Sequence, residues 1–222
     1  MYGESRLRAF IDRAVSSTLG RHHYGGRSWP CLIWRLHGGR LAISSAVSGG
    51  GLGIVEWVLN AQVPSDYRRT DPAAHVAEIA AACELAGSGA GLLTACDVRD
   101  YRRASDGGVV ADATVGIGQP IWAADDAPSR DYRPGTINLV VQIPVRLSEA
   151  ALVNAVATAT EAKTQALWRA GVSGTGTATD AVCVLCPQDG RAEPFAGPRS
   201  VWGARLARAV YAAVSEGLGA GE

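Results

Sequence analysis

The alternation of apolar and polar positions along the chain predicts a series of short strands and a few longer helices. The clearest helical periodicity covers residues 148–170, with Ser148 as the N-terminal cap. Asp71 and Pro72 open a second helix that continues to about residue 86, and further helical patterns cover residues 1–20 and about 199–216. Runs typical of strands occur at residues 31–36, 40–47, 54–63, 89–97, 108–117, 136–145 and 181–186, the first two joined as a hairpin at Gly38–Gly39.

This order mixes hairpins with strand–helix–strand connections, so it predicts an α+β (or mixed α/β) fold. The sheet is expected to be mixed or largely antiparallel and to be covered by about three to four helices. Residues 20–30 and 122–134 read as loops. Because neither an internal repeat nor a low-complexity linker interrupts the pattern, we expect a single domain over residues 1–222.

Lys163 is the exception in the long helical pattern. At 100° per residue it falls in the middle of an apolar stripe. The stripe consists of Leu152, Ala155, Val156, Ala159, Ala162, Ala166 and Leu167. A lysine there either extends along the surface to reach water or is buried beside a carboxylate, because an isolated buried charge is too costly. Asp180 and Glu56 are the candidate partners, and Glu161 lies on the opposite, polar face.

Two glycine-containing segments offer groups that could meet a ligand. Residues 173–180 (SGTGTATD) carry hydroxyls, free N–H groups and a carboxylate, which suits polar ligand binding or an activated nucleophile, although Thr and Gly also simply form turns. Gly49, Gly50 and Gly51 follow a predicted strand and allow close backbone approach. They lack the Lys-Ser/Thr of a phosphate-binding loop, so a tight turn is favoured there.

Composition narrows the class of protein. The 222 residues contain 21 Lys and Arg against 21 Asp and Glu, a balance that argues against a nucleic-acid partner or an anionic membrane surface. No run reaches the length of a membrane span, and the N-terminus lacks the apolar region of a signal peptide, so a cytoplasmic protein is expected.

The five cysteines and four histidines show no spacing typical of a metal site. Cys183 and Cys186 lie in a predicted strand, where positions three apart face opposite sides, so core packing is favoured over chelation. His75 is expected to be solvated, and His22 and His23 to lie at the surface. Most of the six tryptophans are expected in the core, with one or two available to line a large flat ligand.

Seven short stretches carry the most specific pattern. They are residues 45–52 (SAVSGGGL), 60–67 (NAQVPSDY), 93–95 (LTA), 113–116 (ATVG), 134–138 (PGTIN), 158–164 (TATEAKT) and 174–181 (GTGTATDA). In this order they resemble the adenosylcobinamide amidohydrolase family of corrinoid salvage. The resemblance covers about residues 41–216 and leaves residues 1–30 as an N-terminal extension.

The resemblance implies hydrolysis of the amide that joins cobyric acid to aminopropanol in adenosylcobinamide, in salvage for cobalamin synthesis. The corrinoid is then the substrate, and no cofactor is expected. A secondary amide needs an activated water or nucleophile, oxyanion donors and an acid for the leaving amine. Asp180 is the expected base, with Lys163 as its partner or as a donor, Thr175 and Thr177 as nucleophile or donors, and Glu161 as a further catalytic candidate. The expected substrate-binding residues are Gly49, Gly50, Gly51, Asn60, Asp66, Tyr67, Thr136, Asn138, Gly174 and Gly176.

One segment departs from the family. Its members often carry Gly-Thr-His-Thr before the last helix, whereas this chain has Gly197-Pro-Arg199-Ser200, so a base supplied by that histidine is missing here. Two other functions fit the same residues: a corrinoid-binding protein without catalysis, and an amidase for another small amide. The oligomeric state is left open.

Overall fold

The computed structural model describes residues 15–125 and 135–219 as one α+β domain, which confirms the predicted fold class. Its sheet has the strand order β4-β3-β2-β8-β7-β6-β5, with β1 paired to β2 outside this row. The pairs β3–β4 and β7–β8 are parallel and the other pairs are antiparallel. The strands are β1 (Thr18–Tyr24), β2 (Arg27–Ser44), β3 (Gly51–Gln62), β4 (Gly89–Thr94), β5 (Arg102–Asp106), β6 (Val109–Gly116), β7 (Thr136–Gln142) and β8 (Ala181–Cys186). The helices are α2 (Pro72–Ala82), α3 (Glu149–Arg169), α4 (Val201–Gly219) and the short 3-10 helix η1 (Val98–Asp100).

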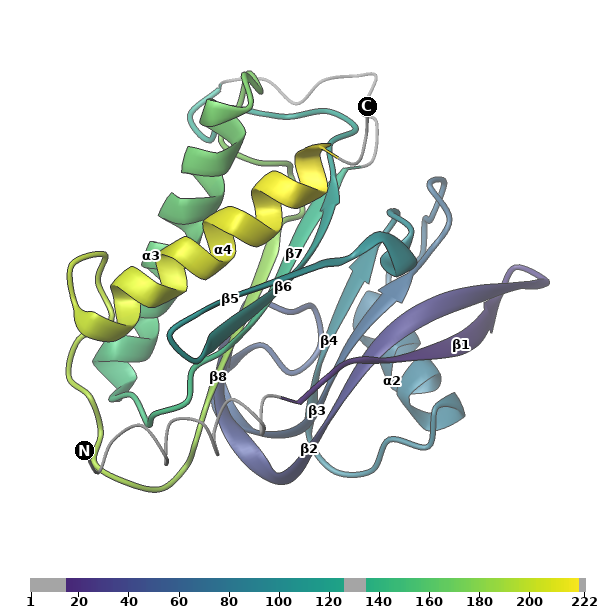
Figure 1. Ribbon diagram of the computed structural model, residues 1–222. Helices are drawn as coiled ribbons and strands as arrows, with labels where there is room; N and C mark the ends of the chain where they lie inside the picture. Colours follow the sequence, from purple (N-terminus) through teal and green to yellow (C-terminus); the bar gives the residue numbers. More distant parts are fainter. Residues whose placement is uncertain (1–14, 126–134, 220–222) are drawn as a thin grey trace.

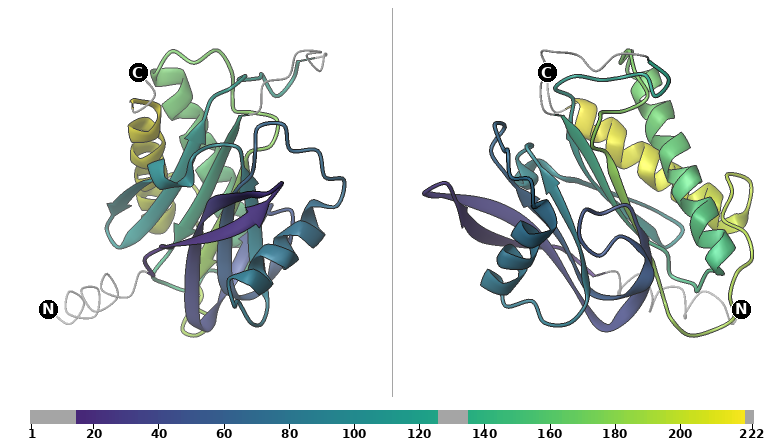
Figure 2. Two further views of the ribbon diagram at one scale, coloured as in Figure 1. Left: turned by 90° about the vertical axis from the view of Figure 1, so that its right-hand side faces the viewer. Right: turned by 180° about the vertical axis from the view of Figure 1, so that it is seen from behind.

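The sheet is curved so strongly that its two halves face each other. The indole N–H of Trp34 on β2 donates to Asp112 on β6 at 2.9 Å, although these strands are not neighbours in the sheet. Helices α3 and α4 lie over the half formed by β5 to β8, and α2 lies beside β3 and β4 (Figures 1 and 2). The chain therefore builds an apolar interior between the two halves of the sheet, with helices on the outside.

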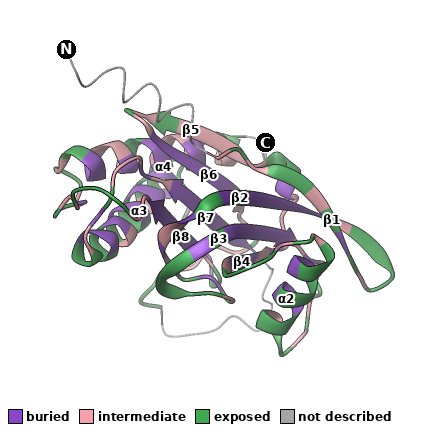
Figure 3. Cartoon of the chain, turned by 90° about the horizontal axis from the view of Figure 1, so that it is seen from below, coloured by how far each residue is buried: buried purple, intermediate pink, exposed green. Residues whose placement is uncertain are grey.

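Three apolar clusters fill these layers. Under α3 and α4 the buried side chains include Leu139 and Leu206, and the interior between the sheet halves contains Leu32 and Leu185. Val76 on the inner face of α2 belongs to the third cluster, against β2 and β3. Figure 3 shows that most of β6 and β7 and the central parts of β2 and β3 are buried, whereas the end of the β1–β2 hairpin is exposed. Burial of this kind is the main favourable contribution to folding.

The two long helices follow their sequence patterns. The side chain of Ser148 accepts a hydrogen bond from Ala151 N at 3.1 Å, so the predicted cap is confirmed. Helix α4 buries Trp202, Leu206 and Val210, which are spaced four residues apart and share one face of the helix. Among the described helices, none combines the length and apolar character that crossing a membrane requires.

The predicted hairpin at Gly38–Gly39 is wrong. Residues 27–44 form one continuous strand, and both glycines sit at an irregularity where pairing with β3 shifts between Arg35 and Arg40. Their φ angles of 77° and 72° produce a bulge that increases the bend of the strand and does not reverse it. The chain reverses instead at Gly25–Gly26, inside the segment that was expected to be a loop.

Other differences are local. The expected helix over residues 1–20 lies mostly outside the described residues, and Thr18–Tyr24 is a strand. Helix α2 ends at Ala82, before the predicted residue 86, and the Asp71 side chain binds Arg69 without capping the helix. The polar strand β5 was missed because it is held by an ion pair to its neighbour, Arg103 to Asp112, and by few apolar residues.

Candidate active site

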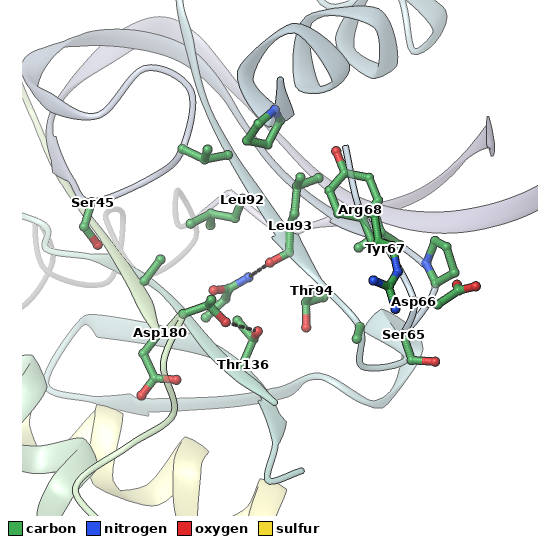
Figure 4. Close-up of a pocket in the computed structure, with 18 residues that line it drawn as sticks. Ser45, Ser65, Asp66, Tyr67, Arg68, Leu92, Leu93, Thr94, Thr136 and Asp180 are labelled. Carbon is green, nitrogen blue, oxygen red and sulfur yellow. Dashed lines mark hydrogen bonds between the residues drawn. The ribbon is translucent and has the colours of Figure 1, made fainter. Parts of the chain in front are cut away.

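A pocket of about 780 Å³ opens between the two halves of the sheet. Its floor comes from the end of β4 and the starts of β7 and β8, and its rim from the segment that connects β3 to α2 (Figure 4). Asp180 and Thr136 lie at one end of the view, and Asp66, Tyr67 and Arg68 lie at the other. The labelled leucines and Thr94 lie between these groups, so the pocket has an end rich in hydroxyls and an end with an aromatic ring.

Asp180 is the most heavily hydrogen-bonded group near the pocket. Its carboxylate pairs with the ammonium of Lys163 and accepts hydrogen bonds from Ile137 N at 2.9 Å and Thr177 N at 3.1 Å. Thr177 Oγ1 also donates to it at 2.5 Å. In Figure 4 the carboxylate points away from the other labelled side chains and toward the helices. Asp180 therefore ties α3 to the loop 174–179 and to the start of β7.

Lys163 is buried in the middle of the apolar face of α3, as expected from its place in the stripe. The residue is 7% exposed, and of the two candidate carboxylates its partner is Asp180. Glu56 is exposed on β3. The absence of a side chain at Gly176 makes this pair possible, because a Cβ there would collide with Asp180 Oδ2 and lie 2.5 Å from Lys163 Nζ.

Two threonine hydroxyls form the surface of the pocket beside Asp180. Thr136 and Thr179 line the pocket, and their Oγ1 atoms are 2.7 Å apart. Thr179 also donates to Gly135 O at 3.1 Å, and the buried Thr177 hydroxyl is 2.7 Å from the same carbonyl. Because Thr177 is held behind the loop, Thr136 and Thr179 are the hydroxyls of this group that face a ligand.

An amide network crosses the interior under the same end of the pocket. The Asn60 side-chain amide donates to Thr114 Oγ1 at 3.0 Å, and Asn138 donates to Asn60 Oδ1 at 2.9 Å and to Leu93 O at 3.0 Å. Asn138 lines the pocket, whereas Asn60 supports it from behind. The buried Oδ1 of Asn138 has no hydrogen-bond partner among the described residues. The network thus joins β3, β6 and β7 and leaves one acceptor unused.

Histidine side chains were expected at the surface, but two of them are buried beside the other end of the pocket. His75 is 2% exposed, and its Nδ1 is 3.0 Å from the hydroxyl of Tyr67. His22 is also 2% exposed, and its Nε2 is 2.8 Å from Gln62 O. Burial lowers the pKa of both imidazoles and raises the pKa of Tyr67, so the neutral forms are favoured. The expectation failed because packing of β1 against α2 buries these rings, and that packing is not visible in local periodicity.

Comparison with protein families gives a match over nearly the whole chain. The family model described as adenosylcobinamide amidohydrolase matches residues 14–221. The chain belongs to this family. The seven stretches that carried the resemblance lie inside the matched range, and five of them contribute residues that line the pocket.

Relatives of the adenosylcobinamide amidohydrolase family support the same assignment. An adenosylcobinamide amidohydrolase of Methanosarcina mazei is 32% identical over 186 residues, which cover 80% of this chain and 89% of the relative. A protein of the same name from Halobacterium salinarum is 35% identical over 133 residues, 57% of each chain. Among solved structures, the PH0078 protein from Pyrococcus horikoshii OT3 aligns with a TM-score of 0.47 and 10% identity, over 94% of this chain and 84% of that one.

Several residues expected at the site lie elsewhere in this family member. Gly49 packs against β4, where a Cβ would collide with Gly89 O, and none of Gly49, Gly50 and Gly51 lines the pocket. Their role is the tight turn that the sequence favoured. Glu161 is exposed on the far side of α3, in a separate hollow of about 420 Å³ with Gly174 and the exposed rings of Trp122 and Trp168.

The remaining loop residues hold the backbone in place. Thr175 Oγ1 accepts from Ala123 N at 3.0 Å and donates to Ile121 O at 3.4 Å, so it joins the loop to the segment after β6. Sequence reasoning overlooked Ser45, Thr94, Thr179 and Arg68, which all line the pocket. The available signal was that Ser45, Thr94 and Thr179 stand inside stretches that carried the resemblance, and that Arg68 directly follows one of them.

The departure at Arg199 falls outside the pocket. Strand β8 begins at the pocket with Ala181, runs to Cys186 at the opposite end of the sheet, and is followed by the segment that contains Arg199 (Figure 1). Arg199 is exposed, and the neighbouring Ser200 side chain accepts from Gly203 N at 3.0 Å at the start of α4. The residue at position 199 therefore does not contribute to the group around Asp180.

The two cysteines of β8 are core residues. Cys183 and Cys186 are buried on opposite faces of β8, and burial raises the pKa of Cys183 to about 12. Among the described residues, no three His, Cys, Asp or Glu side chains lie close enough together to hold a metal ion.

Proposed function

We propose that this protein hydrolyses the amide that joins cobyric acid to aminopropanol in adenosylcobinamide, releasing adenosylcobyric acid and 1-aminopropan-2-ol. The observation that carries the proposal is the pocket, where the family's own stretches gather hydroxyl, amide and carboxylate groups around one opening. The reaction lets a cell salvage a corrinoid for cobalamin synthesis, in the cytoplasm. The cobalt arrives inside the substrate's corrin ring, and the proposal requires no further cofactor.

The hydroxyl-rich end suits the scissile amide. Thr136 and Thr179 present hydroxyls at this end, and either can donate to the developing oxyanion once it turns from its present partner toward the substrate. Such donors are worth about 3–4 kcal/mol each in comparable sites. Asn138 lines the same end of the pocket, and its buried Oδ1 has no hydrogen-bond partner in the described part of the chain. A pocket of this size holds one portion of a corrinoid, with the rest of the macrocycle outside.

Asp180 is best described as a positioning residue. Both of its oxygens are already engaged, one by Ile137 N and Thr177 Oγ1 and the other by Thr177 N and the Lys163 ammonium. In Figure 4 the carboxylate also points away from the other labelled side chains of the pocket. By holding Lys163, the loop and β7 together, it fixes the hydroxyls of Thr179 and Thr136. This role differs from that of a general base, and the two roles make different kinetic predictions.

The first experiment is incubation of the purified protein with adenosylcobinamide, with mass-spectrometric detection of free 1-aminopropan-2-ol. Release of the amine with equal formation of adenosylcobyric acid supports the proposal, and tight binding without release identifies a binding protein. A general base at Asp180 predicts that Asp180→Asn lowers kcat by about 10²–10⁴ with unchanged folding. A positioning role predicts that Lys163→Met loses activity to a similar extent as Asp180→Asn, and that each of these two variants is less stable than wild type. Glu161→Gln, in the separate hollow, is expected to retain turnover.

A further inference from the structure

The aromatic end of the pocket contains a ring that is fixed before any ligand binds. Tyr67 is the only aromatic residue among the described residues that line the pocket. Its hydroxyl bonds to Nδ1 of the buried His75 at 3.0 Å, and the ring of Tyr24 packs against it with centroids 5.5 Å apart. In Figure 4 the hydroxyl end of Tyr67 points away from Asp180 and Thr136. The hydroxyl is thus occupied by the protein, and the His75 ring also stacks against the Tyr67 ring with centroids 5.5 Å apart. The part of the residue left for a ligand is the remaining surface of the half-buried ring.

The segment that carries Tyr67 is anchored on both sides. Arg69 binds Asp71 at 2.7 Å and Glu78 on α2 at 2.6 Å, and Tyr67 N donates to Pro64 O at 3.0 Å. A ring held in this way loses little conformational freedom when a ligand stacks on it, so more of the contact energy appears as affinity.

The residues on either side of Tyr67 are charged and face the same pocket. Asp66 and Arg68 line the pocket, and neither makes a hydrogen bond or ion pair with another residue of the described chain. Ser65 adds a hydroxyl at the same rim. A flat ring flanked by a hydroxyl, and by a carboxylate and a guanidinium that have no partner within residues 15–125 and 135–219, matches a nucleoside. The base stacks, and the carboxylate accepts from an exocyclic amine or from ribose hydroxyls.

We propose that the Tyr67 end of the pocket binds the adenosyl upper ligand of the corrinoid, with adenine stacked on Tyr67 and Asp66 accepting from the nucleoside. This inference rests on the proposed function, which assigns the scissile amide to the opposite end beside Thr136. Tyr67 then determines specificity for adenosylated corrinoids, and His75 positions its ring.

The test measures binding of the reaction product in two forms, adenosylcobyric acid and cyanocobyric acid, by ultrafiltration and absorbance. Wild type is expected to favour the adenosyl form. Tyr67→Leu keeps apolar bulk but removes the flat ring, and it should weaken adenosyl binding by about 5- to 150-fold with little change for the cyano form. Tyr67→Phe should keep the preference, and Trp168→Ala, which removes an exposed ring outside the pocket, should leave both affinities unchanged.

The outcomes separate the two proposals. The role of Tyr67 is overturned if wild type binds both forms equally or binds neither. It is also overturned if Tyr67→Leu weakens binding of both forms equally, and each of these results counts even if aminopropanol is released. Selective binding that depends on Tyr67, together with no release of aminopropanol from adenosylcobinamide, would support the nucleoside site and reject the hydrolase function.

Discussion

Replacing Lys163 with methionine tests whether the ion pair with Asp180 holds the site together. The side chains are 8% and 12% exposed, so the variant leaves a carboxylate that is largely shielded from water without its counter-charge. Losing one partner of a buried pair costs about 3–5 kcal/mol. Asp180 keeps its hydrogen bonds from Ile137 N and from Thr177 N and Oγ1, which places the expected loss near the lower end, about 3 kcal/mol.

The assay is urea unfolding followed by circular dichroism, with thermal unfolding in parallel. For a chain of this size a loss of 3 kcal/mol lowers Tm by about 6–12 °C. Methionine has a helix propensity close to that of lysine, so α3 itself should not be weakened. The double variant Lys163→Met/Asp180→Asn removes both charges and should be about 2 kcal/mol more stable than the sum of the single changes implies.

Arg208→Met provides the matched control, because it removes a cation from the surface pair with Asp106, where the side chains are 59% and 30% exposed. Its effect on stability should be much smaller than that of Lys163→Met. If Lys163→Met unfolds within about 1 kcal/mol of wild type and shows no coupling to Asp180→Asn, the pair is not a buried anchor and the reasoning fails.

Three further predictions follow from the same geometry. Gly176→Ala should lower the free energy of unfolding by about 1–3 kcal/mol and remove most of the turnover, because the added Cβ would collide with the ion pair of Asp180 and Lys163. Urea unfolding measures the first effect, and the amine-release assay measures the second. Stability should fall as pH drops below about 6.5, because the folded state holds His22 and His75 neutral by burial, with Arg69 adding repulsion, so the unfolded state binds more protons. His75→Gln should flatten this slope in Tm, and an unchanged slope would contradict the assignment. Dialysis against a chelator should leave aminopropanol release unchanged, and recovery that requires an added metal would show that a metal site was missed.

The sequence alone determined the features that depend on local periodicity. The stripe on α3, its cap at Ser148 and the place of Lys163 within the stripe follow from side chains three or four positions apart, which share one face of any helix. The pairing of Lys163 with Asp180 could be proposed because apolar surroundings demand a counter-charge and few acids lay nearby. The order of the seven stretches was sufficient to identify the family.

Tertiary structure decided the features that depend on segments far apart in the chain. Asp180 meets Ile137 N because β7 and β8 are parallel neighbours, and Tyr67 meets His75 because the segment after β3 folds onto α2. The glycines at 38–39 bend a strand, where the local pattern favoured a hairpin, because the partner strand continues past them. The physical reason is that periodicity reports which face of an element is apolar, whereas strand order and sheet curvature depend on non-local packing. The pocket, with its hydroxyl end and its aromatic end, exists only after that packing has formed.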